Sequence, residues 1–244
     1  MQQGEERIDD LLWHNLKIIQ NPQWFCFSLD AVLLADFVTL RPGDRVVDLG
    51  TGTGVIPLLL STRARGTHIV GLEIKPEVAD MAQRSVALND LARHIEIKVG
   101  DMRSAGDQLG KGVFDLVVSN PPYAPVSSGK ISGSFIKAAA RTEILCTMED
   151  VIREGSALLN SEGRFAMVHR PSRIGEILSL MRNFKLEPKR MRFVHPIIDK
   201  EPNLVLVEGI KNGKKDVLVL PPLFIYQDTG VYSEEMKTIF QGKF

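Results

Sequence analysis

The chain has 244 residues, of which 44% are hydrophobic and 25% are charged. These proportions are those of a globular protein, and they exclude a disordered or collagen-like chain. Thirty basic and thirty acidic residues give a formal net charge of zero. This balance excludes a polycation that coats nucleic acid and leaves room for a local basic face.

Cysteine and histidine usage argues against a disulfide framework and a metal site. Cys26 and Cys146 are far apart and form no C-x-x-C pair, so both are expected to be small core residues. The five histidines show no metal-ligand spacing. The first ten residues do not resemble a signal peptide, and no apolar run approaches about 18 residues. We therefore expect a cytoplasmic protein without a membrane or metal partner.

The first 43 residues are predicted to form a cap on the domain that follows, residues 44–244. Residues 17–19 and 25–27 flank the turn-like Asn21-Pro22, which predicts a hairpin, and residues 30–40 have a helical pattern.

From Asp44 onwards short apolar runs alternate with helical patterns, which is typical of an α/β protein with a parallel sheet. The expected strands are 45–49, 68–73, 95–99, 114–119, 164–169, 192–196 and 203–209, and the expected helices are 55–63, 76–89, 143–159 and 172–184. This pattern predicts seven strands, mostly parallel, with helices on both faces. Residues 124–134 have the composition of a mobile loop, and the tail from Leu218 suggests one more strand, a Pro221-Pro222 break and a short helix.

A glycine-rich turn follows the first strand of this pattern. The residues from Asp48 to Gly54 read D-L-G-T-G-T-G, with Val55 where a dinucleotide-binding fingerprint would have its third glycine. The motif resembles motif I of the class I S-adenosylmethionine-dependent methyltransferases. The resemblance implies a Rossmann-like fold, S-adenosylmethionine as cofactor, and Asp48 near its methionyl amino group.

An acidic residue stands at the end of each of the next two expected strands. Glu73 ends the second strand, where a carboxylate can accept both ribose hydroxyls. Asp101 ends the third strand, where the family has a group that contacts the adenine amino group. The predicted cofactor site consists of Asp48, Gly50, Thr51, Gly52, Gly54, Glu73, Ile74, Asp101, Met102 and Asn120.

The fourth strand runs into Asn120-Pro121-Pro122-Tyr123. An amine on a conjugated ring is a poor nucleophile because its lone pair is delocalised. The Asn120 side-chain oxygen and the Pro121 carbonyl could accept its two hydrogens, the prolines would hold the backbone, and Tyr123 would stack on the acceptor. The tetrad resembles motif IV of the amino-methyltransferases, and we predict Asn120, Pro121, Pro122 and Tyr123 as catalytic.

Further stretches resemble one narrower family. They are F-S-L-D-A-V-L-L-A at 27–35, A-R-T-E at 140–143, V-H-R-P-S-R at 168–173 and L-P-P-L-F-I-Y at 220–226. Together they are similar to the bacterial valine-tRNA adenine-N6-methyltransferases, which methylate adenosine 37 beside the anticodon. The resemblance implies tRNA, through its anticodon loop, as the partner. No obligate protein partner is indicated.

A basic segment supports a nucleic-acid substrate, because residues 164–215 hold 12 basic and 5 acidic side chains. The predicted substrate-binding residues are Tyr123, Lys130, Phe135, His169, Arg170 and Arg173. Adenosine 37 would have to turn out of the anticodon loop to reach the crevice. From the loop composition we hypothesise that Phe135 or the 124–134 loop closes over this base.

Three alternatives remain open. A glutamine N5-methyltransferase of a release factor shares N-P-P-Y, although such enzymes usually carry a helical N-terminal domain for which about 40 residues leave no room. A binding module without catalysis is a second alternative, which the intact tetrad opposes. Adenine N6-methylation of ribosomal RNA or DNA is the third, and the sequence separates it poorly from tRNA methylation.

Overall fold

A computed structural model describes the chain except for residues 1–5, 12, 23–25, 124–145 and 243–244. Its strands are β1 (Arg7–Asp10), β2 (Lys17–Gln20), β3 (Arg45–Leu49), β4 (His68–Glu73), β5 (Ile95–Val99), β6 (Phe114–Ser119), β7 (Leu159–His169), β8 (Leu186–His195), β9 (Leu204–Lys211), β10 (Leu218–Val219), β11 (Leu223–Phe224), β12 (Tyr226–Asp228) and β13 (Val231–Tyr232). Its helices are α1 (Leu29–Phe37), α2 (Val55–Ser61), α3 (Pro76–Leu88), α4 (Ala105–Leu109), α6 (Met148–Leu158), α7 (Ile174–Asn183) and α8 (Glu234–Phe240), with short 3-10 turns at Met102–Ser104 and Pro171–Arg173.

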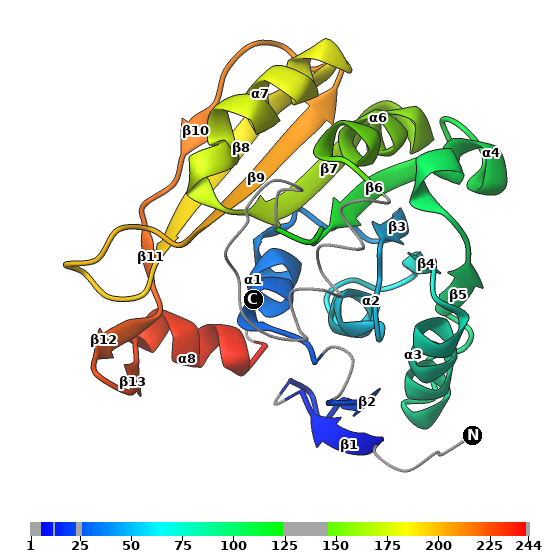
Figure 1. Cartoon of the computed structure of the whole chain (residues 1–244), viewed down its shortest axis with the longest axis horizontal. Helices are drawn as coiled ribbons and strands as arrows, with labels where there is room; N and C mark the ends of the chain where they lie inside the picture. The colour runs from blue at the N-terminus through cyan, green and yellow to red at the C-terminus, as the bar shows by residue number, and fades with distance from the viewer. Residues whose placement is uncertain (1–5, 12, 23–25, 124–145, 243–244) are drawn as a thin grey trace, which may run out of the picture.

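A mostly parallel sheet forms the centre of the molecule, as predicted (Figure 1). Its long strands run in the order β8-β9-β7-β6-β3-β4-β5, and β3 to β7 are parallel to one another while β9 is antiparallel to both β7 and β8. In the described chain two short strands, β10 and β11, also pair with β8, so the sheet has nine strands rather than the seven predicted. Both come from the tail, for which the sequence predicted one strand, and β10 begins at the predicted Leu218.

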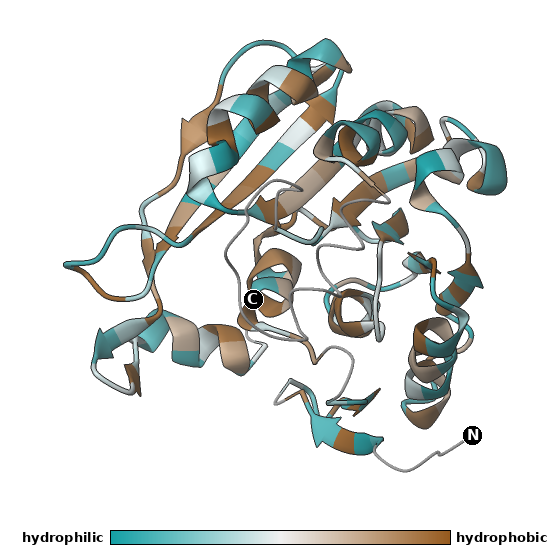
Figure 2. Cartoon of the chain, in the orientation of Figure 1, coloured by the Kyte–Doolittle hydropathy of each residue, from teal (hydrophilic) through white to brown (hydrophobic). Residues whose placement is uncertain are grey.

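Helices cover both faces of the sheet, and each face has its own hydrophobic core. On one side α1, α2 and α3 bury residues such as Leu34 and Leu59. On the other side α4, α6 and α7 bury residues such as Ile152 and Ile177 against Phe165 of β7. Figure 2 shows hydrophobic colour over nearly all of α2, whereas α3 and α6 carry both colours because their outer sides face solvent.

Local sequence signals explain where several helices begin. Pro76 occupies the first turn of α3, where its fixed φ suits the helix and no amide hydrogen is needed. Thr147 and Asp150 cap α6 reciprocally, since each side chain accepts a hydrogen bond from the other residue's backbone. Helix α6 therefore starts at Met148. The expected first residues of this helix, 143–145, lie outside the described part of the chain.

The N-terminal hairpin differs from the prediction. Strand β2 pairs antiparallel with β1, and the connection contains His14 and Asn15 at φ of 51° and 58°. The predicted partner segment begins outside the described residues, and residues 26–28 form no strand. The prediction missed β1 because its sequence, R-I-D-D, is too short and polar to be recognised as a strand.

Residues before Asp44 pack directly on the sheet domain. Helix α1 contributes six buried side chains to the core that it shares with α2 and the sheet, and the buried Trp13 donates from Nε1 to Thr62 at 3.1 Å. Buried Arg164 of β7 donates to the carbonyl oxygen of Thr39 at 2.6 Å and forms an ion pair with Asp44 at 2.8 Å. These contacts join the N-terminal segment to the centre of the sheet. The described helices include none that is both long and apolar enough to cross a membrane.

Candidate active site

The four parallel strands β3 to β6 end at one edge of the sheet, and the residues that follow them line a crevice. Strand order places the end of β3 between those of β4 and β6, which is where open α/β sheets bind ligands. The lining includes the predicted Gly50, Glu73, Ile74, Asp101, Met102 and Asn120. The other predicted cofactor residues, Asp48, Thr51, Gly52 and Gly54, belong to the end of β3 and the glycine turn and are not among the lining residues.

The glycine turn is held against the end of β4. The backbone amides of Gly50 and Thr51 both donate to the carbonyl oxygen of Leu72, at 2.9 and 3.0 Å. Gly50 adopts a φ of +77°, and a Cβ there would lie 2.9 Å from the methyl carbon of Met102. Glycine at this position therefore satisfies the left-handed backbone and the close approach of Met102.

Glu73 connects this turn with the segment that starts α3. Its Oε2 accepts a hydrogen bond from the Gly52 amide at 3.1 Å, and its Oε1 accepts one from the Lys75 amide at 3.0 Å. Each carboxylate oxygen has two lone pairs, so one remains on each oxygen for a ligand hydroxyl. The arrangement fits the predicted pair of hydrogen bonds to a ribose.

Asp48 is sealed beneath the glycine turn. Burial raises the pKa of Asp48 to about 7, and the negative charge of Glu73 acts in the same direction. The neighbouring Thr51 hydroxyl favours the ionised carboxylate and lowers its pKa, although its geometry completes no hydrogen bond to either oxygen. Since the Thr51 hydroxyl offsets only part of the effect of burial, a nearby cation would further stabilise the ionised form, which fits a positively charged cofactor.

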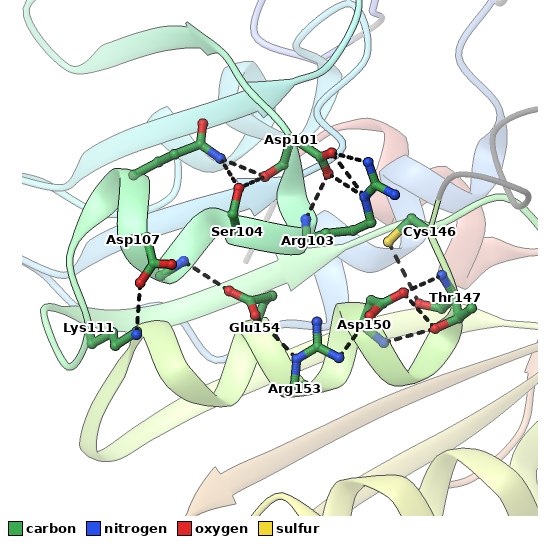
Figure 3. A network of polar contacts seen from close by, with 12 residues as sticks. Asp101, Arg103, Ser104, Asp107, Lys111, Cys146, Thr147, Asp150, Arg153 and Glu154 are labelled. Carbon is green, nitrogen blue, oxygen red and sulfur yellow. Dashed lines mark hydrogen bonds and ion pairs between the residues drawn. The ribbon is translucent and has the colours of Figure 1, made fainter.

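Asp101 remains an ionised acceptor at the third strand end. Arg103 donates to its carboxylate at 2.5 Å and holds the pKa of Asp101 below its usual range (Figure 3). Figure 3 also shows this group close to the N-terminus of α6, where Cys146 precedes Thr147. Because the Arg103 amide and guanidinium together make four contacts with its two oxygens, an amino group would share the carboxylate with Arg103 or displace the guanidinium.

The Asn-Pro-Pro-Tyr tetrad follows β6 directly. The Ser119 hydroxyl donates to the carbonyl oxygen of Leu49 at 2.9 Å and so links β6 to β3 just before the tetrad. Asn120, Pro121 and Pro122 line the crevice. Tyr123 turns toward α1, and its hydroxyl oxygen lies 2.8 Å from Asn120 Oδ1 and 2.6 Å from Asp30 Oδ2.

Two predicted substrate residues contact Tyr123. The Arg170 guanidinium lies 5.1 Å from the centre of the Tyr123 ring, and the His169 ring meets it edge to face at 5.1 Å. His169 is only 2% exposed, and burial lowers its pKa to about 4, so the imidazole is neutral at physiological pH. Because Arg170 covers one face of the ring, an acceptor that stacked on Tyr123 as predicted would have to use the other face or displace Arg170.

Other predicted substrate residues have different surroundings. Arg173 forms an ion pair with Glu176 at 2.6 Å. Lys130 and Phe135, together with the 124–134 loop, lie outside the described residues. Within the basic segment, buried Arg164 binds the N-terminal segment and cannot contribute to a basic surface. The Lys211 ammonium donates to two carbonyl oxygens at the end of α6.

The sequence interpretation missed two residues of the site. Cys146, expected in the core, is half-buried and lines the crevice, where burial raises the pKa of its thiol to about 12 and makes it a poor nucleophile. Asp30, in the first turn of α1, was not assigned to the site, and it contacts the tetrad through the Tyr123 hydroxyl. The only sequence signal for Asp30 was its place in the F-S-L-D stretch. Among the described residues there is no group of three or more His, Cys, Asp or Glu side chains that could hold a metal ion.

Comparison with known proteins decides the family. The model of the methyltransferase small domain matches residues 16–186. A tRNA1(Val) (adenine(37)-N6)-methyltransferase of Porphyromonas gingivalis is 30% identical over 84% of this chain and 83% of its own length. One of the same name from Parabacteroides distasonis is 31% identical over 73% and 74%. The chain belongs to the tRNA1(Val) (adenine(37)-N6)-methyltransferase family.

Solved structures confirm the class I methyltransferase fold. A protein described as a predicted O-methyltransferase from Agrobacterium tumefaciens has a TM-score of 0.71 and 24% identity, over 88% of this chain and 96% of its own. A geranyl diphosphate C-methyltransferase from Streptomyces coelicolor, solved with S-adenosyl-L-homocysteine, has a TM-score of 0.54 and 16% identity, over 75% of this chain and 78% of its own. The family of this chain thus has the Rossmann-like architecture that its glycine turn predicted.

Proposed function

We propose that this protein transfers a methyl group from S-adenosylmethionine to the N6 amino group of adenosine 37 in a valine tRNA. The observation that carries the reaction type is the position of Asn120, which lines one crevice together with Gly50, Glu73 and Asp101. A nucleophile held by Asn120 would therefore lie beside a cofactor held by the other three. Membership of the family supplies the substrate.

The residues of the chain divide into two groups in this proposal. Glu73 would bind the ribose hydroxyls, Asp101 the adenine amino group of the cofactor, and the glycine turn with Thr51, Ile74 and Met102 would enclose the cofactor. Asp48 would favour the positive charge of the cofactor from below the turn. When bound, S-adenosylmethionine supplies an electrophilic methyl group.

Asn120 and Pro121 would prepare the acceptor. Their oxygens accept hydrogen bonds from the two N6 hydrogens, which localises the nitrogen lone pair and directs it at the methyl carbon. The nitrogen would gain the methyl group as the carbon–sulfur bond of S-adenosylmethionine breaks, which would release S-adenosylhomocysteine, and the nitrogen would then lose one proton to solvent. Because the residues mainly align the two reactants, most of the rate acceleration arises from orientation. Adenosine 37 lies in a single-stranded loop, so turning it out of its stack costs little.

The decisive experiment measures methyl transfer from radiolabelled S-adenosylmethionine to valine tRNA, followed by nucleoside analysis. We expect labelled N6-methyladenosine, and no label in a matched tRNA transcript that carries guanosine at position 37. Label in ribosomal RNA or in a release factor, with none in tRNA, would overturn the substrate and leave the fold intact.

Two substitutions test the division of roles. Asn120→Ala should lower kcat by at least about 100-fold while the cofactor Kd changes by less than about threefold, because Asn120 acts on the acceptor amine. Glu73→Gln should raise the cofactor Kd by about 10-fold, because one ribose acceptor becomes a donor. Titration calorimetry gives both Kd values. Equal loss of cofactor binding in the two variants would contradict these assignments.

A further inference from the structure

The Tyr123 hydroxyl lies between two oxygen acceptors. Its oxygen is 2.6 Å from Asp30 Oδ2, which belongs to α1, and 2.8 Å from Asn120 Oδ1. A phenol has one hydrogen, so it can make a full hydrogen bond to only one of them at a time. The position of this proton decides whether Oδ1 or Nδ2 of Asn120 can face the Tyr123 hydroxyl.

The proton favours Asp30. A hydrogen bond to a carboxylate is shorter and about twice as strong as one to a neutral oxygen, and the distance to Asp30 is the shorter of the two. Burial and the charge of Asp30 both raise the pKa of Tyr123 well above its usual range, so the phenol keeps its proton. Tyr123 then offers only lone pairs to Asn120.

The Asn120 side chain can respond without moving its backbone. The nitrogen and oxygen of an amide occupy equivalent positions, and a half turn about the Cβ–Cγ bond exchanges them. With Nδ2 toward Tyr123, Asn120 donates to the phenol oxygen, and Oδ1 takes the opposite position. Since Asn120 lines the crevice, that oxygen becomes available to an amine there.

Neighbouring side chains hold Tyr123 between Asp30 and Asn120. Arg170 covers one face of its ring and His169 meets the ring edge to face. Asp30 is fixed because α1 buries Ala31, Val32 and Leu33 in the core immediately after it. The hydroxyl therefore has a defined place between the N-terminal segment and the tetrad.

We propose that Asp30 is a positioning residue that acts through Tyr123 to turn the Asn120 amide oxygen toward the acceptor amine. The inference rests on the proposed function, since it assigns the orientation that an amine donor requires. The opposite orientation would present an N–H group to the N–H groups of the acceptor. Asp30 thus makes the crevice selective for an amino group.

The kinetics of three variants test whether Asp30 acts on Asn120 through Tyr123. Asp30→Asn should lower kcat for tRNA about 10-fold, because a neutral partner leaves both Asn120 orientations populated. The cofactor Kd should stay within about twofold. Tyr123→Phe, which keeps the ring, should lower kcat by a similar factor, and the double variant should be no slower than Tyr123→Phe alone.

The control is Asp36→Asn on the same helix, which lines a separate cavity with Arg63 and Arg190 and should change kcat less than about twofold. Multiplicative losses in the double variant, or an unchanged kcat in Asp30→Asn, would overturn the inference.

A neutron diffraction structure gives a readout that does not depend on activity. We expect the Tyr123 deuteron to point at Asp30 and the Asn120 nitrogen to face Tyr123. A deuteron directed at Asn120 would overturn the inference, even if the enzyme methylates tRNA. Conversely, a wild-type protein that methylates no tRNA would refute the proposed function, while the deuteron position would still show whether Tyr123 donates to Asp30 or to Asn120.

Discussion

Asp48 is completely buried, and the Thr51 hydroxyl offsets only part of the effect of burial on its carboxylate. Such a group weakens the protein without ligand as the pH rises. Because its pKa is raised from 3.8 to about 7 on folding, the unfolded chain releases the proton at lower pH than the folded protein, and the free energy of unfolding falls between about pH 4 and pH 7. An acid retained at this cost indicates that its charge is needed when the ligand is bound.

The affinity for S-adenosylmethionine should therefore rise with pH. A cationic ligand prefers the ionised carboxylate, and the ionised fraction of Asp48 grows as the pH passes about 7. Between about pH 6 and pH 8 we expect the Kd to fall by up to about 10-fold. Calorimetric titration across this range measures it.

Asp48→Asn is the matched control, because the amide has the same shape and no charge to titrate. We expect its Kd to be higher at pH 8 and nearly independent of pH. A wild-type Kd that stays constant from pH 6 to pH 8 would mean that the charge of Asp48 does not contribute to binding of the ligand.

At the scale of elements, strand β4 contains a glycine in its interior. A Cβ at Gly71 would lie 2.8 Å from the Ile97 side chain on β5 and 2.9 Å from two side-chain atoms of Thr51. Gly71 therefore lets the glycine turn pack directly over the sheet. Gly in a strand is otherwise unfavourable, and it commonly marks a close approach of this kind.

Gly71→Ala should push Thr51 and the turn away from β4. We expect the free energy of unfolding to fall by about 1–3 kcal/mol and the cofactor Kd to rise by about 10-fold, since overpacking displaces the binding turn. Urea denaturation and calorimetry measure the two effects.

The matched control is Gly175→Ala in α7, where an added Cβ would meet nothing within 4 Å. Alanine is favourable in a helix, so this variant should be unchanged or slightly more stable, with an unchanged Kd. Equal effects of the two alanines would show that Gly71 has no special role.

The same scale shows why the sequence predicted some elements and missed others. The glycine turn and the tetrad were placed correctly because each is a contiguous motif at the end of a buried strand. The N-terminal hairpin was assigned to the wrong partner because pairing is non-local, and polar β1 gives little hydrophobic signal. Asp30 was missed because its contact with Tyr123 joins residues that are 93 positions apart in the chain.

Across the whole molecule, buried charges connect the N-terminal segment to the sheet. Glu208 of β9 accepts hydrogen bonds from the Thr39 amide and hydroxyl at 2.6 and 2.7 Å. Arg164 binds the Thr39 carbonyl oxygen and Asp44, and its side chain is 4% exposed. Since Asp30 and its helix precede this junction, the geometry of the tetrad depends on the whole N-terminal segment being docked.

We therefore expect residues 1–43 and the domain that follows to unfold as one unit. Circular dichroism and the fluorescence of buried Trp13, isolated by Trp24→Phe, should give the same urea midpoint. Arg164→Met should lower the free energy of unfolding by about 3 kcal/mol, because it leaves Asp44 buried without its partner. Lys237→Met, which removes an ion pair with Glu234 in which both side chains are exposed, should cost less than about 1 kcal/mol. If the fluorescence transition instead preceded the circular dichroism transition, the N-terminal segment would be a separate folding unit, and the Asp30 contact with Tyr123 would be lost before the sheet unfolds.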